Sequence, residues 1–336
     1  MAQLDLLLPE GKIGNYTIQD TVELAKAAEA AEFRTVWKGE SYSTNSFMNL
    51  SSIATATETI NLGTAITNVF TRPPALIAMS AATLDMLSDG RTVLGLGVST
   101  ETVIKSWYGQ SYERPLRRTR EMIEVLQAMF AEETVEYDGE IFDVGPYPVG
   151  FDMDRETMPI YNAAMGPTNC RLTGEYADGW LPVYTPPETI RTLYEEEILH
   201  GVEAADRDPA DVSVTPLVTT SVAETTAAAR TQARRSLAQA MAVGYNGHVA
   251  QFGFGDAPDE AAAHWRKGNR DAATAAICDP MVDELTVAGT PEECRSRLQE
   301  LQEQTGADTI SVMPPYTATP ADIESMLTAL EPITST

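Results

Sequence analysis

Short apolar runs alternate with longer helical patterns along the whole chain, and this alternation constrains the fold more than any other feature of the sequence. The runs have the length of β-strands, and the segments between them repeat apolar residues with a helical period. Near-continuous apolar strands joined by helices are typical of a parallel sheet covered on its outer face. We count eight such strands, at residues 4–8, 34–37, 60–67, 91–98, 159–164, 178–183, 212–222 and 308–314.

Eight strands separated by helices predict an α/β fold, the (β/α)8 or TIM barrel. A hairpin is expected near residues 134–144, and residues 245–285 read as a helical insertion before the last βα unit. No Ser/Gly-rich linker or low-complexity tract divides the sequence, so we expect a single domain over residues 1–336. A doubly wound protein of two domains is the alternative.

The chain is strongly acidic. Of its 336 residues, 49 are acidic and 23 are basic, which gives a net charge of −26. A field of this sign repels nucleic acid and anionic membranes, so neither is an expected partner. The acidic residues are spread along the sequence, which indicates a solvated acidic surface and not an interaction tail. Our hypothesis is that the protein is halophilic, because concentrated salt screens the repulsion within such a surface.

Cysteine and histidine patterns argue against a disulfide framework or a metal site. Cys170, Cys278 and Cys294 are odd in number and widely spaced, and the three histidines form no HxxxH pair. No apolar run approaches the roughly 20 residues of a membrane span, and the first residues lack a secretory-signal pattern. We therefore expect a soluble, cytoplasmic protein without a bound metal.

Three of the expected strands end in small or polar residues, and strand ends are where a barrel carries its site. The third ends in Ala65–Asn68, the fourth in "GLGVSTET" and the fifth in "AAMGPTN". In the fifth, Gly166 permits a tight turn, and the helix N-terminus that follows can hold a phosphate. Taken alone, each end could be a strand turning towards solvent or a close backbone contact. Together they indicate a slot for a flat cofactor that carries a phosphate.

Longer segments resemble the luciferase-like oxidoreductase superfamily, and the likeness covers nearly the whole chain. It is carried by "AKAAEAAEFRTVWKGESY", "INLGTAITNVFTRPPALIAMSAATLDMLSDGRTVLGLGVST", "PIYNAAMGPTNCRLTGEYADGW" and "AGTPEECRSRLQEL". The sequence is most similar to the branch that uses the deazaflavin coenzyme F420. The resemblance implies a barrel, a homodimer and a cofactor that lies across the mouth of the barrel.

The resemblance also implies site residues. In this family a bulge on the third strand, often with a non-prolyl cis peptide, backs the cofactor ring, and the matching peptide here is Ala65–Ile66. Thr67 and Asn68 would lie beside the pyrimidine edge. The implied cofactor-binding residues are Ala65, Ile66, Thr67, Asn68, Gly97, Val98, Ser99, Thr100, Ala164, Met165, Gly166, Pro167 and Thr168.

Two departures from the family pattern bear on activity. Many relatives carry Asp-His after the second strand, and Glu40-Ser41 stands there in this chain. These two residues are the catalytic candidates: Glu40 could supply a carboxyl group to a proton transfer, or could simply be solvated at the barrel mouth. The methylenetetrahydromethanopterin reductases of the family carry a glutamate in the first strand, where Leu6 stands here, and Asp5 points to the opposite face.

The predicted function is hydride transfer between coenzyme F420 and a small organic substrate. A pterin-bound one-carbon unit, an alcohol/ketone pair and a conjugated alkene all remain open as substrates. The first alternative is an FMN-dependent monooxygenase of the same fold, although Val98 stands where that branch often has a basic side chain near the phosphate. The second alternative is a non-catalytic relative that binds the cofactor.

Overall fold

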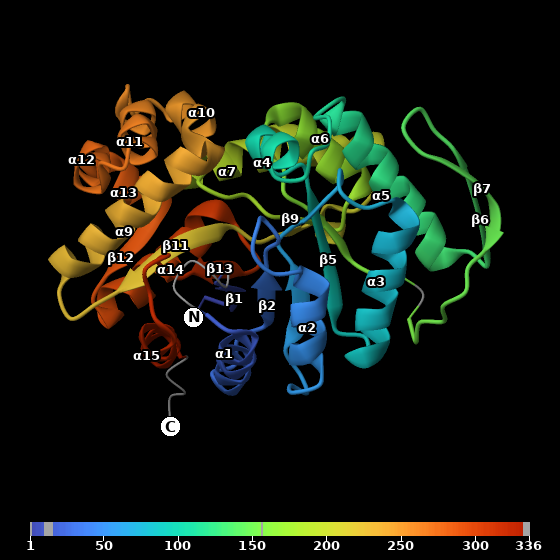
Figure 1. Cartoon of the computed structure of the whole chain (residues 1–336), viewed down its shortest axis with the longest axis horizontal. Helices are drawn as coiled ribbons and strands as arrows, with labels where there is room; N and C mark the ends of the chain where they lie inside the picture. Colours follow the sequence, from blue (N-terminus) through green and yellow to red (C-terminus); the bar gives the residue numbers. More distant parts are fainter. Residues whose placement is uncertain (1, 10–15, 156, 332–336) are drawn as a thin grey trace. The chain divides into compact units, whose positions relative to one another are not determined.

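A computed structural model describes residues 2–9, 16–155 and 157–331, which divide into two compact units. The terminal unit combines Met1–Arg34, Pro182–Thr192 and Val214–Thr336. The central unit combines Thr35–Leu181 and Leu193–Ser213. Each unit contains parallel, hydrogen-bonded strands with helices packed beside them (Figure 1). The single domain predicted from the sequence stays a prediction.

The central unit is built on a parallel sheet in the strand order β2–β3–β5–β8–β9, with β4 paired to β5. Its strands are β2 (Thr35–Lys38), β3 (Asn61–Thr64), β4 (Thr67–Asn68), β5 (Thr92–Gly97), β8 (Ile160–Asn162) and β9 (Gly179–Trp180). The antiparallel pair β6 (Thr134–Asp138) and β7 (Asp143–Pro148) confirms the predicted hairpin.

Helices in the central unit follow its strands in alternation, as the sequence predicts. They are α2 (Ser46–Ala54), α3 (Pro74–Leu87), α4 (Glu101–Ser106), α5 (Pro115–Ala131), α6 (Pro167–Tyr176) and α8 (Leu199–Ala204), with the short segments η1 (Tyr194–Ile198) and η2 (Pro209–Asp211). Helices α3, α5 and α6 each begin with proline. Proline has no N–H, and the first residue of a helix needs none, because its N–H would have no partner within the helix. The chain passes from the central unit to the terminal unit within the two-residue strand β10 (Ser213–Val214).

In the terminal unit, parallel strands pair in the order β12–β11–β13–β1. Its strands are β1 (Leu4–Leu8), β11 (Leu217–Val222), β12 (Thr286–Gly289) and β13 (Ile310–Met313). Its helices are α1 (Ile18–Ala30), α7 (Pro187–Leu193), α9 (Thr226–Ala240), α14 (Pro291–Thr305) and α15 (Pro320–Leu330). The hydroxyl of Thr17 caps α1, and Thr290 caps α14 in the same way.

The predicted helical insertion is present, but it precedes the last two βα units and not the last one alone, because a strand that was not predicted follows it. After η3 (Met241–Tyr245) come α10 (Asn246–Val249), η4 (Ala250–Phe252), α11 (Ala257–Arg266), α12 (Arg270–Ala276) and α13 (Asp279–Leu285). These helices share a buried apolar cluster with α9 that includes Leu237, Met241 and Met281. The chain then enters β12 directly, a strand that the sequence pattern missed, and β12 pairs with the second half of β11.

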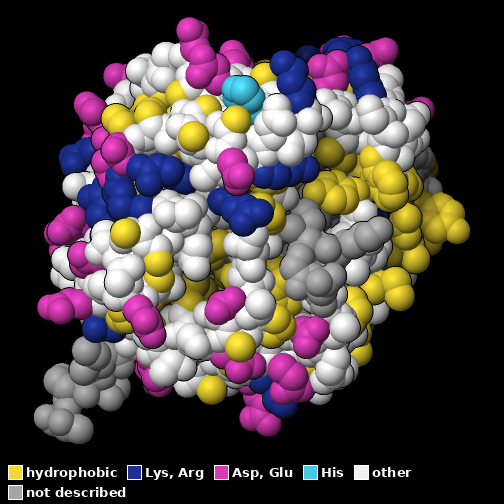
Figure 2. All heavy atoms as spheres, turned by 60° about the vertical axis from the view of Figure 1, so that its left-hand side comes forward, with side chains coloured by type: hydrophobic (Ala, Val, Ile, Leu, Met, Phe, Trp, Pro, Cys, Tyr) yellow, Lys and Arg dark blue, Asp and Glu magenta, His cyan; other side chains and the backbone are white. Residues whose placement is uncertain are grey.

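The surface carries its acidic side chains in a scattered arrangement. On the face shown in Figure 2, Asp and Glu lie over many parts of the molecule, interspersed with Lys and Arg. This distribution agrees with the solvated acidic surface expected from the sequence. Among the described residues, no helix is both long enough and apolar enough to cross a membrane.

Candidate cofactor site in the central unit

The chain between β3 and β4 departs from a regular strand. The hydroxyl of buried Thr64 donates to the Gly95 carbonyl at 2.7 Å and accepts from the Gly95 amide at 2.9 Å. A Cβ at position 95 would lie 1.8 Å from the Thr64 carbonyl oxygen, so this close approach requires glycine. The next peptide, Ala65–Ile66, is cis, which confirms the geometry predicted for it.

The two residues of β4 carry polar atoms without partners. Thr67 and Asn68 are both fully buried. The Oδ1 atom of Asn68 accepts from the amides of Phe70 and Thr71, each at 3.1 Å, and so closes the turn after the strand. In the part of the chain that the structure describes, Asn68 Nδ2 and Thr67 Oγ1 have no hydrogen-bond partner. Because buried polar atoms are nearly always paired, β4 is a place where a ligand could supply the missing partners.

Small residues and local structure shape the end of β5. A Cβ at Gly97 would approach Ile66 to 3.1 Å, so glycine keeps this contact open. Val98, Ser99 and Thr100 are half-buried, and Ser99 has a positive φ of 57°. The Thr100 hydroxyl caps α4, a short helix that the sequence pattern did not predict. The Thr100 side chain is therefore used in the helix cap, whereas those of Val98 and Ser99 are not.

The β8–α6 connection supplies an uncapped helix N-terminus. The Ala164 carbonyl accepts from Trp180 Nε1 at 2.8 Å, which fixes the start of the loop. Met165 is half-buried, and Gly166–Thr168 is exposed. Among the described residues, no side chain caps the N-terminus of α6, a helix of 10 residues. Its first amides and the helix dipole are suited to an anion.

The three predicted strand ends are neighbours in one sheet. Asn68 of β4 pairs with Gly97 of β5, and Leu96 pairs with Asn162 of β8. Since the strands are parallel, their carboxyl ends meet at the same edge. The structure therefore brings together the residues that the sequence assigned to one cofactor slot.

The predicted catalytic residue Glu40 is already engaged by two side chains. Its Oε1 lies 2.6 Å from Arg72 Nη2, and its Oε2 accepts from the Ser46 hydroxyl at 3.0 Å. The side chains of Glu40 and Arg72 are only 10% and 12% exposed, and the guanidinium also lies over the Phe47 ring at 5.6 Å. Glu40 is thus a largely buried partner of Arg72 and not a carboxylate solvated at the barrel mouth. Ser41 beside it is half-buried.

Sequence reasoning missed a second arginine close to these strand ends. The guanidinium of Arg118, on the first turn of α5, lies 5.1 Å from the Phe70 ring centre and 5.2 Å from that of Phe142. Tyr112 stacks on Phe70 at 4.9 Å, and its hydroxyl lies 3.5 Å from the carbonyl oxygen of Ser99. Burial lowers the pKa of Arg118 and raises the pKa of Tyr112. In the sequence Arg118 is one of three arginines in "RRTR", a pattern typical of a solvated helix face.

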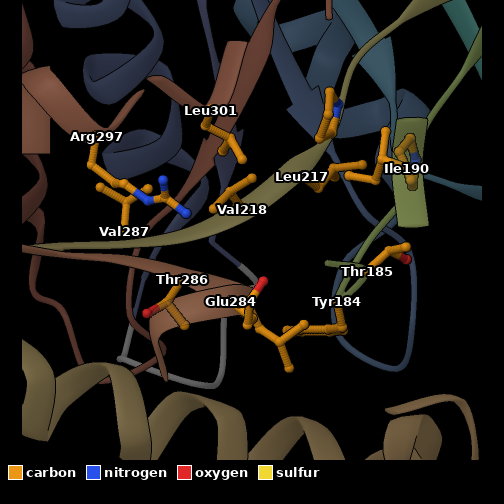
Figure 3. A pocket seen from close by; sticks show the side chains of 13 residues that line it. Tyr184, Thr185, Ile190, Leu217, Val218, Glu284, Thr286, Val287, Arg297 and Leu301 are labelled. Atoms are coloured by element: carbon orange, nitrogen blue, oxygen red, sulfur yellow. The ribbon is translucent and has the colours of Figure 1, made fainter. Parts of the chain in front are cut away.

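A pocket in the terminal unit is too small to compete as a cofactor site. Figure 3 shows its lining side chains, with Tyr184 and Thr185 on one side and Val287 and Arg297 on another. Its volume is about 10 Å³, which is the space of a single water molecule. No group of three His, Cys, Asp or Glu side chains that could hold a metal ion occurs among residues 2–9, 16–155 and 157–331.

Solved structures share this fold. The coenzyme F420-dependent tetrahydromethanopterin reductase of Methanopyrus kandleri matches with a TM-score of 0.83 at 22% identity, over 98% of both chains. An F420-dependent secondary alcohol dehydrogenase, in complex with an F420–acetone adduct, matches with a TM-score of 0.76 at 19% identity, over 98% of this chain and 99% of the other. The fold class is therefore the predicted α/β TIM barrel, with candidate site residues at its strand ends.

Sequence comparison gives the family. The model of the luciferase-like monooxygenase family matches residues 6–309. The 5,10-methylenetetrahydromethanopterin reductase of Methanolobus tindarius is 31% identical over 280 residues, which are 82% of this chain and 85% of the relative. The chain belongs to the luciferase-like monooxygenase family.

Proposed function

We propose that this protein is a coenzyme F420-dependent oxidoreductase that transfers a hydride between the deazaflavin and a small organic substrate. The observation that carries the proposal is the pair of orphaned buried atoms at β4, Thr67 Oγ1 and Asn68 Nδ2. A flat ring with polar atoms along one edge would satisfy them. Two relatives of the same fold are F420-dependent oxidoreductases, which supports this choice of cofactor.

Each strand end has a proposed part in holding the cofactor. The Ala65–Ile66 backbone supports one face of the ring, and Asn68 donates to its pyrimidine edge. Val98–Thr100 lines the ring or the ribityl chain, and the exposed amides at Gly166–Thr168 bind the phosphate. When bound, the deazaflavin supplies or accepts the hydride, and the protein positions the substrate and excludes water.

The roles proposed for Glu40 and Ser41 follow from their contacts. Because Arg72 and Ser46 occupy both carboxylate oxygens of Glu40, we assign Glu40 a positioning role in which it holds Arg72 over Phe47. Ser41, the next residue, is the proposed direct contact with substrate. The imidazole that many relatives place at this point is replaced by a hydroxyl here.

The substrate is proposed only as a class. A pterin-bound one-carbon unit is supported by the 31% identity to a methylenetetrahydromethanopterin reductase, and an alcohol/ketone pair by the fold shared with a secondary alcohol dehydrogenase. Against the pterin, Leu6 stands in β1 where those reductases carry a glutamate, and it is fully buried.

We also propose that the protein is a homodimer that uses the outer face of α3. This helix exposes Leu76, Met79, Met86 and Leu87, each 46–56% accessible, while its other face is buried. A helix that is apolar on all sides is normally covered. Sedimentation velocity on Met79→Glu/Met86→Glu is expected to show monomers, with Val243→Glu as the control in the terminal unit. A monomeric wild type would contradict the proposal.

The function is tested by titrating the purified protein, in high salt, with coenzyme F420 and separately with FMN while fluorescence is recorded. We expect F420 to bind and FMN to bind much more weakly. Tight FMN binding without a response to F420 would favour the alternative of an FMN-dependent monooxygenase. Binding of neither would favour a relative that has lost activity.

A further inference from the structure

Arg118 is a partly buried cation without an ion pair among the described residues; burial lowers its pKa, although the charges of Glu121 and Glu113 act on it in the opposite direction. Among the described residues, it forms no ion pair, and its buried Nε atom has no hydrogen-bond partner. The guanidinium lies over two aromatic rings, those of Phe70 and Phe142. Cation–π contacts of this kind hold the charge in place but accept none of its N–H hydrogen bonds.

Other partly buried arginines of the central unit have acceptors. Arg72 is paired with Glu40, and Arg155 is paired with Asp85 at 2.6 Å. Arg91 donates to several backbone carbonyls, including that of Ile60 at 2.6 Å. In a chain with 49 acidic residues, a carboxylate partner is the ordinary outcome for an arginine. The acceptor for Arg118 must then come from solvent or from a ligand.

The position of Arg118 favours a ligand. Phe70, which it contacts, donates its amide to Asn68 at 3.1 Å. Tyr112, stacked on the same ring, reaches the carbonyl oxygen of Ser99. Arg118 is therefore connected through Phe70 and Tyr112 to two of the three strand ends that form the proposed slot, at β4 and after β5. Val98, at the end of β5, leaves that strand end without a basic side chain of its own.

We propose that Arg118 binds an oxyanion, phosphate or carboxylate, on the tail of the bound deazaflavin. This inference rests on the proposed function. The planar guanidinium can present two parallel N–H groups to such an anion, and the rings of Phe70 and Phe142 hold it in place. Phe70 and Phe142 are positioning residues, since they act through the guanidinium.

The test compares two ligands that share a ring and differ in the tail. Coenzyme F420 carries the phosphate and carboxylates, and the riboflavin-level deazaflavin FO carries neither. We expect Arg118→Gln to weaken F420 binding roughly tenfold to a hundredfold and to leave FO binding unchanged. The matched control is Arg117→Gln, which removes the same charge from an exposed arginine paired with Glu140 at 2.9 Å. It should leave the binding of both ligands unchanged.

Each other outcome has a defined meaning. Equal weakening of F420 and FO by Arg118→Gln would overturn the inference, because a structural role would act on the ring. Unchanged binding of both F420 and FO would overturn it too. If the variant raises only the KM for a carboxylate substrate, the anion that Arg118 binds belongs to the substrate and the inference is wrong. Arg118→Lys, which keeps the charge, should recover part of the F420 affinity and serves as the variant if Arg118→Gln does not fold.

Failure of the proposed function is distinguishable from failure of this inference. If wild type binds neither F420 nor FO, the proposed cofactor is wrong. The same arginine is then tested with FMN and riboflavin, which differ only in a phosphate. Loss of FMN affinity in Arg118→Gln with riboflavin unaffected would still support an oxyanion site, and no difference between the two would overturn it.

Discussion

Two arginines of the central unit lie over phenylalanine rings, Arg72 over Phe47 and Arg118 over Phe70. Their other contacts differ, and this difference indicates a structural role for the first and a binding role for the second. Arg72 lies over Phe47 and has Glu40 at 2.6 Å. Arg118 lies over Phe70 and has no carboxylate partner among the residues described. The first charge has an ion-pair partner within the chain, whereas the second has none among the described residues and is proposed to bind an anion from outside. The same aromatic support therefore serves a buried ion pair in one region and a proposed ligand contact in the other.

The largest expected effect comes from breaking the Arg72 pair. We expect Glu40→Ala to lower the free energy of unfolding by about 3 kcal/mol, because it leaves a nearly buried guanidinium without its partner. Urea unfolding measures this loss. The control, Glu101→Ala, breaks an exposed pair with Lys105 and should change the value by less than about 0.5 kcal/mol. A double variant, Glu40→Ala/Arg72→Met, should recover part of the stability, and no recovery would contradict this account.

The two arginines are charged, whereas His248 in the terminal unit is an ionisable group that stays neutral in the folded protein near pH 7. Burial lowers the pKa of His248 from 6.5 to about 4, and its Nε2 lies 3.1 Å from the Thr185 hydroxyl. Between pH 6.5 and pH 4, His248 is protonated in the unfolded chain but neutral in the folded chain. The free energy of unfolding therefore falls as the pH drops from 6.5 towards 4. The loss is at most roughly 3 kcal/mol.

The measurement is the difference between wild type and His248→Gln, since carboxylates titrate in the same range. Unfolding free energies at pH 7 and pH 4.5 should show a smaller loss in the variant. Equal losses in the two proteins would mean that His248 is protonated in the folded state.

Salt screens interactions between exposed charges much more than interactions between buried ones. We expect the unfolding midpoint of wild type to rise from dilute buffer to multimolar KCl, because salt screens the repulsion within a chain of net charge −26. The cost of Glu40→Ala should persist at high salt, since a buried pair is screened little. Thermal unfolding across a salt series tests both points. A midpoint that does not rise with salt would refute the halophilic hypothesis.

The smallest expected effect is that of Arg118 on the folded chain itself. Arg118→Gln should change the free energy of unfolding without ligand by less than about 1 kcal/mol, because the lost cation–π contacts are offset by removal of a poorly solvated charge. Urea unfolding of the free protein measures it. A loss as large as that of Glu40→Ala would erase the contrast between the two arginines and favour a structural role for Arg118.

The sequence was sufficient to predict most of the fold because strands and helices have strong local periods. It missed β12, since Thr286–Gly289 follows α13 with no glycine or proline between them. It predicted the cis Ala65–Ile66 peptide only through a family resemblance, and no local pattern would have done so. It could not predict the Glu40–Arg72 pair or the lack of a partner for Arg118, because both depend on residues distant in sequence that folding brings together or leaves apart.

The division of the chain between the two units has a consequence for how the protein is made. In the terminal unit, Leu4 of β1 is paired with Ile310 of β13, whereas the central unit is complete at Ser213. During synthesis the central unit can therefore form as soon as it leaves the ribosome. Within the terminal unit, the edge of β1 that pairs with β13 stays open until one of the last strands emerges, so this edge is exposed to other chains before release.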